Sequence, residues 1–180
     1  MPHAVTNDNV RLYFEEVGSG TPILFLHEFA ADHTNWEPQM RYFSRGHRCI
    51  AYSARGYTPS DVPGSVDSYS YKHFYTDAIA VLDHLKISKA HFVGLSMGSY
   101  SSLHAAMNAP ERVLSMTLAG VGSGSSLENL ETFRKTCRET ADQFEAIGSA
   151  EVAVAGSTPN WPYRLWPQQY TSPSLVTAQV

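Results

Sequence analysis

The stretch Phe92-Val93-Gly94-Leu95-Ser96-Met97-Gly98-Ser99 decides how this chain folds. It carries a G-x-S-x-G pattern between an apolar, strand-forming run and a segment rich in alanine and serine that stops at Pro110. A serine at such a junction must turn sharply out of a sheet, and its neighbours must be small so that the strand and the helix can approach each other. The pattern predicts a buried strand, a tight bend at Ser96 (called the elbow below) and a helix that begins directly after it.

The chemistry of the elbow has two interpretations. A helix N-terminus beneath Ser96 would place partial positive charge where an anion forms when the serine attacks a substrate. The alternative is a glycine-rich turn that holds a phosphate. The chain contains neither G-x-G-x-x-G nor G-x-x-x-x-G-K, the patterns expected of such turns. The sequence therefore favours a serine nucleophile.

Strand and helix patterns alternate on both sides of the elbow. Apolar residues recur at i, i+4, i+7, i+8 and i+11 from Phe74, which is typical of an amphipathic helix. Thr34 and Glu37 have the spacing of a capping box, so another helix should begin near residue 35. Strands are expected at 10–17, 22–26, 48–53, 90–95 and 113–119, and helices at 35–43, 74–85 and 99–109. This alternation predicts an α/β fold with a doubly wound, mostly parallel sheet.

Composition limits the classes of protein that the chain can represent. Its 180 residues suit one domain, and a net charge of −4 argues against binding to nucleic acid or to an anionic membrane, since both need a basic face. No apolar run approaches the ~18 residues of a membrane span, and the first residues, Met1-Pro2-His3, lack a basic-then-apolar pattern, so we expect no signal segment. Two cysteines, Cys49 and Cys137, make neither a disulfide framework nor a zinc site. We expect a soluble, cytoplasmic globular protein.

The pattern changes after the last expected strand. A loop of glycine and serine precedes an amphipathic helix expected within residues 127–148. Residues 149–180 hold only two charges, Glu151 and Arg164, but four of the ten prolines and two of the three tryptophans. No periodicity is evident there, so we expect an irregular tail. The expected organisation is a core at 1–126, the start of a lid helix at 127–148 and a tail at 149–180.

Four blocks of the sequence resemble the α/β-hydrolase family, in the order that the family has them. They are Ile23-Leu24-Phe25-Leu26-His27-Glu28-Phe29, Ala54-Arg55-Gly56-Tyr57-Thr58-Pro59-Ser60-Asp61, the elbow, and Ala109-Pro110-Glu111-Arg112-Val113. The resemblance covers about residues 10–119 and implies a sheet of α/β-hydrolase type that is truncated after the sixth strand. The activity it implies is acyl transfer to water through a serine ester, as in esterases and lactonases. The substrate would be a small molecule with an ester, a lactone or an activated carbon–carbon bond, and no metal or organic cofactor is implied.

The resemblance also assigns roles to individual residues. Ser96 would be the nucleophile, and the N–H groups of Met97 and Phe29 would form the oxyanion hole, where one donor is worth about 2.7–4 kcal/mol in measured cases. Phe29, Trp36 and Met97 would line an apolar acyl site. An enzyme with an aspartate nucleophile, such as an epoxide hydrolase of the same fold, is disfavoured because the elbow carries a serine.

The sequence departs from the family pattern at two loops. Glu28 stands where the family usually has glycine, and we expect its side chain to point to solvent or to a backbone donor of the loop. Ser53 occupies the approximate place of an acidic residue that the family has before the block at residues 54–61. The loop formed by that block is therefore expected to lack the family's usual bracing side chain.

The sequence does not supply the base and the acid of a complete triad, which follow the serine in this family. His104 is the only histidine after Ser96, and it lies about 12 Å further along the helix at 1.5 Å per residue. The first acidic residue after the strand at 113–119 is Glu128. His33 is close in sequence to the block that ends at Phe29, and it is only a weak candidate for a substitute base. Three interpretations stay open: an impaired, truncated hydrolase, a non-catalytic binding protein on the same scaffold, and an enzyme completed by a partner chain. An unpaired sheet edge would also favour self-association.

Overall fold

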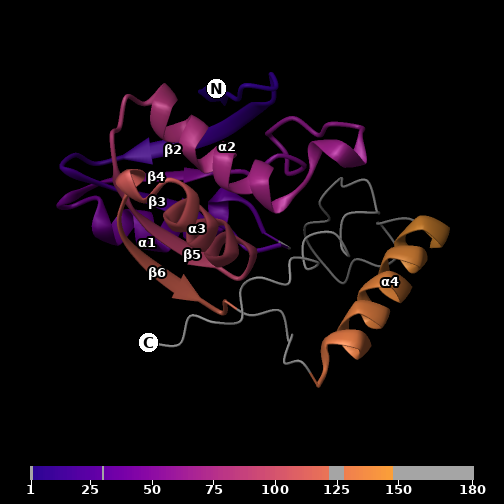
Figure 1. Cartoon of the computed structure of the whole chain (residues 1–180). Helices are drawn as coiled ribbons and strands as arrows, with labels where there is room; N and C mark the ends of the chain where they lie inside the picture. Colours follow the sequence, from indigo (N-terminus) through magenta and orange to yellow (C-terminus); the bar gives the residue numbers. More distant parts are fainter. Residues whose placement is uncertain (1, 30, 122–127, 148–180) are drawn as a thin grey trace.

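Six strands form a single mixed sheet in the computed structural model, which describes residues 2–29, 31–121 and 128–147 (Figure 1). The strands are β1 (His3–Val5), β2 (Arg11–Val17), β3 (Thr21–Leu26), β4 (His47–Tyr52), β5 (Ala90–Leu95) and β6 (Val113–Ala119). Their order across the sheet is β1-β2-β4-β3-β5-β6. The β1–β2 and β2–β4 pairs are antiparallel, whereas β4, β3, β5 and β6 run parallel. The mostly parallel sheet predicted from the sequence is confirmed.

Helices connect the parallel strands and begin or end where the sequence provides signals. Within the described ranges they are α1 (Glu37–Phe43), α2 (Tyr71–His84), α3 (Met97–Asn108) and α4 (Leu130–Ile147), with short 3-10 helices η1 (His33–Trp36), η2 (Val66–Ser68) and η3 (Pro110–Arg112). Ser70 begins α2 because its hydroxyl accepts a hydrogen bond from the His73 N–H (3.3 Å). α3 ends before Pro110, which cannot continue a helix. None of the described helices combines the length and the apolar character needed to cross a bilayer.

α4 occupies the region where an amphipathic helix is expected, and Figure 1 shows it apart from the sheet. The role of this helix as the start of a lid, and the division of the chain into core, lid helix and tail, stay predictions. The expected tail at 149–180 lies outside the described residues.

The side chains of β3 alternate between two layers of the core. Leu24 and Leu26 belong to a larger cluster with apolar residues of α2 and α3, whereas Ile23 and Phe25 belong to a smaller cluster with residues of η1 and α1. Figure 1 shows α2 and α3 side by side over the sheet. Helices on both faces bury the central strands, as a doubly wound sheet requires. The elbow follows directly from the end of β5, a strand that lies between β3 and β6.

β6 is an edge strand within the described part of the chain, where it pairs only with β5. Its seven residues carry no charge, and Leu114 and Met116 are each 38% exposed. Natural edge strands usually carry charges, prolines or bulges that oppose pairing with another chain. Among the described residues, β6 therefore presents the unpaired edge that the sequence predicts.

Two details of the fold differ from the sequence prediction. β1 is not predicted, because a three-residue strand is too short to show alternation, and its pairing with β2 supplies its stability. The prediction of a capping box formed by Thr34 and Glu37 is wrong. Asp32 is the cap instead, since its carboxylate accepts a hydrogen bond from the Thr34 N–H (2.8 Å), and the chain enters α1 through η1.

Candidate active site

The bend predicted at Ser96 is present between β5 and α3. Ser96 has φ 49° and ψ −108°, a conformation that residues with a Cβ rarely adopt. Its N–H donates to the Ala119 carbonyl at the end of β6 (2.8 Å). The Ser99 hydroxyl lies within hydrogen-bond distance of the same carbonyl (2.8 Å) and of the Gly94 carbonyl (2.7 Å). These bonds tie the elbow to two strands, and the sequence analysis did not single out Ser99 because a serine near a helix start is common.

Gly94 and Gly98 allow the strand and the helix to meet at the elbow. A Cβ added to Gly98 would lie 2.0 Å from the Leu26 carbonyl oxygen, and one added to Gly94 would lie 2.4 Å from the Gly98 carbonyl oxygen. Both distances are far below van der Waals contact, and the atoms met belong to the backbone. The close approach predicted from the two glycines is therefore present.

Ser96 stands at the N-terminus of a twelve-residue helix. The Ser96 side chain is half-buried and makes no hydrogen bond to another described residue. The first N–H groups of α3 carry partial positive charge because they lack acceptors within the helix. Met97 is the first residue of α3, so its N–H is one of these donors. An anion that forms beside Ser96 would be stabilised by that charge.

Residues 27–29 follow β3 directly, and because Phe29 is predicted to supply an oxyanion donor they are called the oxyanion loop below. His27 is buried there, and its Nε2 accepts a hydrogen bond from the Ala54 N–H (3.0 Å). Its Nδ1 lies 2.7 Å from the Glu28 carbonyl oxygen, so Nδ1 carries the proton and donates it. Burial lowers the pKa of His27 to about 4, so the ring is neutral at pH 7. His27 thus links the oxyanion loop to the start of the next loop.

That next loop, the R-G loop (residues 54–61), reaches the oxyanion loop through Tyr57. The buried Tyr57 hydroxyl donates to the Phe29 carbonyl and lies 3.9 Å from Met97 Sδ. The structure thereby brings together Phe29 and Met97, the two residues predicted to form the oxyanion hole. Sequence analysis missed Tyr57, because a contact between residues 28 apart leaves no local pattern.

Ser53 supplies a brace where the sequence lacks the family's acidic residue. Its hydroxyl lies 2.8 Å from His33 Nδ1, and His33 Nε2 lies 3.5 Å from Glu15 Oε1. Both ring nitrogens of His33 are therefore engaged away from Ser96, which does not fit a substitute base. Glu28 is half-buried, and its carboxylate has no hydrogen-bond or ion-pair partner among the described residues.

The ring of His104 packs among three tyrosines. The ring centroids lie 4.7 Å from Tyr71, 6.3 Å from Tyr75 and 4.6 Å from Tyr100. Burial lowers the pKa of His104, because the charged ring would lose its hydration. This histidine is part of the packing between α2 and α3, as its distance from Ser96 along the helix predicts.

Trp36 lies in the smaller of the two apolar clusters. Its ring centroid is 5.2 Å from that of Phe25, and the side chain is buried. Phe29 and Met97 pack instead with the larger cluster. The structure therefore does not bring Trp36 together with the other two residues predicted to contact the substrate.

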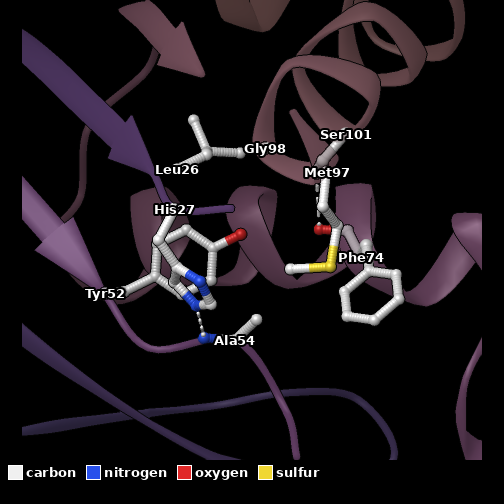
Figure 2. A pocket seen from close by; sticks show the side chains of 8 residues that line it. All are labelled: Leu26, His27, Tyr52, Ala54, Phe74, Met97, Gly98 and Ser101. Carbon is white, nitrogen blue, oxygen red and sulfur yellow. Dashed lines mark hydrogen bonds between the residues drawn. The ribbon is translucent and has the colours of Figure 1, made fainter. Parts of the chain in front are cut away.

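A small cavity lies behind the oxyanion loop, and Figure 2 shows the side chains around it. It is lined by Leu26, His27, Tyr52, Ala54, Phe74, Met97, Gly98 and Ser101. It leaves about 10 Å³ to a water-sized molecule, which is room for one water at most. This cavity is a packing space that separates His27 from Met97, too small for a substrate. No group of three or more His, Cys, Asp or Glu side chains in the described ranges is arranged to hold a metal.

A strained serine between a parallel strand and a helix, with a loop from the neighbouring strand beside it, is the backbone geometry that a nucleophile elbow requires in an α/β protein. The family model for the alpha/beta hydrolase fold matches residues 21–164 of this sequence. The chain belongs to the α/β-hydrolase fold family.

Curated relatives include two kinds of enzyme. Epoxide hydrolase 3 of Siraitia grosvenorii is 28% identical over 167 residues, which are 83% of this chain and 53% of that protein. 3-Oxoadipate enol-lactonase 1 of Acinetobacter baylyi is 30% identical over 139 residues, which are 77% of this chain and 48% of that protein. The chain thus spans about half the length of these relatives.

Solved structures share the fold. The enol-lactonase from Burkholderia xenovorans LB400 superimposes with a TM-score of 0.72 at 23% identity, over 84% of this chain and 56% of that one. Est816, described as an N-acyl homoserine lactone degrading enzyme, has a TM-score of 0.66 at 32% identity, over 83% of this chain and 59% of that one.

Proposed function

We propose that the chain carries the nucleophile and the oxyanion hole of a hydrolase that acts on carboxylic esters or lactones. Ser96 Oγ attacks the carbonyl carbon, and the carbonyl electron pair moves to oxygen, where the N–H groups of Met97 and Phe29 hold the oxyanion. The alcohol leaves with the serine proton, and water then hydrolyses the acyl ester on Ser96. The observation that carries the proposal is the strained backbone of Ser96 above the N-terminus of α3.

The serine favours esters and lactones over epoxides. Attack of a serine hydroxyl on an epoxide would form an ether, which water does not cleave, so the enzyme could not turn over. Attack on an ester, a lactone or an activated carbon–carbon bond forms an acyl ester that water cleaves. The similarity to an enol-lactonase and to a lactone-degrading enzyme supports this choice within the family.

We propose that the reaction is slow in this chain. A serine hydroxyl is a weak nucleophile until a base accepts its proton, and the Ser96 hydroxyl makes no hydrogen bond to another described residue. His33 is bonded to Ser53, and His104 packs among tyrosines. The same observation favours a second candidate function, a binding protein in which the elbow holds a carbonyl compound without cleaving it.

A fluorophosphonate probe separates these two functions. The hydrolase proposal expects slow covalent labelling of the folded wild-type chain that is abolished in Ser96→Ala. Ser102→Ala is the control, because it removes another hydroxyl of the same helix, one that donates within α3 to the Gly98 carbonyl (2.8 Å), and leaves the bonds of Ser99 to the two strands in place. A folded chain that stays unlabelled under saturating probe would exclude an activated serine and favour the binding function.

We further propose that two copies of the chain pair through β6. Among the described residues the outer edge of β6 is unpaired, the strand carries no charge, and its side chains Leu114 and Met116 are partly exposed. Sedimentation velocity should show dimers or larger species for the wild type and fewer of them for Met116→Lys. Met107→Lys is the matched control, since Met107 is an exposed methionine of α3 and is not part of β6. Equal sedimentation of all three proteins would contradict pairing through β6.

A further inference from the structure

Two peptide planes flank the Phe29 α-carbon, and each is held by a different side chain. The first plane contains the Glu28 carbonyl and the Phe29 N–H. His27 Nδ1–H donates to the Glu28 carbonyl at 2.7 Å. Because the carbonyl and the N–H of a trans peptide point in opposite directions, this bond also sets the direction of the Phe29 N–H.

The second plane contains the Phe29 carbonyl, which accepts a hydrogen bond from the Tyr57 hydroxyl. Tyr57 is 4% exposed, so its hydroxyl has little water to compete for that bond. The Tyr57 ring also lies edge-on to the His27 ring, with centroids 4.6 Å apart. Tyr57 therefore holds one plane directly and packs against the side chain that holds the other.

Tyr57 also contacts the residue after the nucleophile. Its Oη lies 3.9 Å from Met97 Sδ, while the hydroxyl proton goes to the stronger acceptor, the Phe29 carbonyl. The Tyr57 hydroxyl thus contacts both residues whose N–H groups are proposed to donate hydrogen bonds to the oxyanion. A shift of either residue would break or strain a contact of the same hydroxyl.

Backbone hydrogen bonds of the R-G loop fix the position of Tyr57. The Tyr57 N–H donates to the Ala54 carbonyl (3.1 Å), and the Ala54 N–H donates to His27 Nε2 (3.0 Å). The hydrogen bonds of Ala54, His27, Phe29 and Tyr57 thereby close a ring between the two loops. Such a ring resists separation of the loops, because no member can move without breaking a buried hydrogen bond.

We propose that Tyr57 is a positioning residue for the oxyanion hole, which fixes the Phe29 N–H relative to the Met97 N–H through its hydroxyl. The proposal rests on the function proposed above for these two N–H groups. Tyr57 does not touch the reacting atoms in this scheme. Its effect is on the alignment of donors that are useful only when they point at the developing charge.

Tyr57→Phe tests the proposal, because it removes the hydroxyl and keeps the ring against His27. Tyr69→Phe is the matched control, since the buried Tyr69 hydroxyl also donates to a backbone carbonyl, that of Pro63 (2.8 Å). Two quantities are compared in the folded full chain. One is the hydrogen-exchange rate of the Ala54 amide by NMR, since that N–H is hydrogen-bonded to His27 within the ring, and the other is the rate constant for labelling of Ser96 by a fluorophosphonate.

Tyr57→Phe should speed exchange of the Ala54 amide by about tenfold and slow labelling of Ser96 by about tenfold. Tyr69→Phe should change neither beyond about twofold. Equal changes in the two variants would mean a general loss of stability and would overturn the proposal. If Tyr57→Phe changes nothing while Ser96→Ala abolishes labelling, Tyr57 is not a positioning residue but the proposed hydrolase function stands. If the wild type is not labelled, the hydrolase function fails, and the exchange rate alone decides whether Tyr57 holds the loop.

Discussion

Arg55 and Asp77 form a bidentate ion pair in the interior of the protein. Arg55 Nε lies 2.7 Å from Asp77 Oδ2 and Nη2 lies 2.6 Å from Oδ1, with side chains 1% and 0% exposed. The Asp8 carboxylate and the Ser68 carbonyl accept the remaining hydrogens, so all five guanidinium N–H groups have acceptors. Burial raises the pKa of Asp77 to about 6, because the loss of hydration outweighs the bonds from Arg55. Arg55 thus anchors the R-G loop, and with it Tyr57, to α2 and to the β1–β2 connection.

Asp77→Asn should lower the free energy of unfolding by about 3–5 kcal/mol at pH 7. The variant removes the buried carboxylate and leaves Asp8, whose side chain is partly exposed, as the remaining charged partner of the guanidinium. The penalty is large because the interior around Asp77 offers no water in exchange. Urea denaturation measures the loss. Glu37→Gln is the control, since its pair with Arg41 on α1 is exposed and should contribute less than about 1 kcal/mol. Similar losses in the two variants would mean that Arg55 does not anchor the loop through Asp77.

The order of strands and helices was predictable because local patterns determine it. The apolar run of β3, the stripe of α2 and the small residues around Ser96 each carry their signal within about ten residues. The Arg55–Asp77 pair was not predicted, since its partners are 22 residues apart. A charged residue directly before Ala78, inside the apolar stripe of α2, was the one available signal.

The candidate site was predictable only where it is local. Ser96 and Met97 are adjacent, and two glycines at fixed spacing mark their bend. The contact of Tyr57 with Phe29 joins loops after β4 and β3, strands that are neighbours only in the folded sheet. Trp36 lies in the smaller apolar cluster, apart from Phe29 and Met97, and no local pattern in the sequence shows that separation.

Gly98→Ala should destabilise the protein although it lies in a helix. Helix propensity alone would favour alanine by about 1 kcal/mol. The added Cβ would meet the Leu26 carbonyl oxygen at 2.0 Å, and a backbone atom of a buried strand cannot move aside. We expect a loss of about 3 kcal/mol in the free energy of unfolding, measured by urea denaturation. Gly64→Ala is the control, because its Cβ would meet no atom within 4 Å, and an equally stable Gly98→Ala would rule out the close approach of α3 to β3.

The wild type should lose stability relative to His27→Gln as the pH falls. The pKa of His27 is about 4 in the folded protein against an ordinary 6.5, so the unfolded chain binds more protons between these values. The contribution of His27 to the free energy of unfolding therefore falls as the pH falls from about 6.5 to about 4. Below pH 4 the ring is protonated in both the folded and the unfolded chain, and this contribution stops changing. Glutamine can accept the Ala54 hydrogen bond but does not titrate, and the titration of Asp77 cancels because both proteins contain it.

The difference in unfolding free energy between the wild type and His27→Gln should therefore shrink by about 2 kcal/mol between pH 7.5 and pH 5. Chemical denaturation at each pH measures it. A constant difference for His27→Gln would mean that the ring is not held neutral by burial.

Replacement of Ser96 by glycine and by alanine should separate backbone strain from the loss of the hydroxyl. Both variants lack Oγ, and neither should react with a fluorophosphonate. A residue with a Cβ at φ 49° and ψ −108° carries strain of about 1–3 kcal/mol, which glycine relieves at a loss of about 0.5–1 kcal/mol in chain entropy. Ser96→Gly should therefore be about 1 kcal/mol more stable than Ser96→Ala in urea denaturation. Met107, exposed on the same helix, should show the reverse order with the same two replacements, because its backbone is helical and favours alanine. If both positions favour alanine, the bend at Ser96 is not strained, and the elbow loses the feature that sets its serine apart.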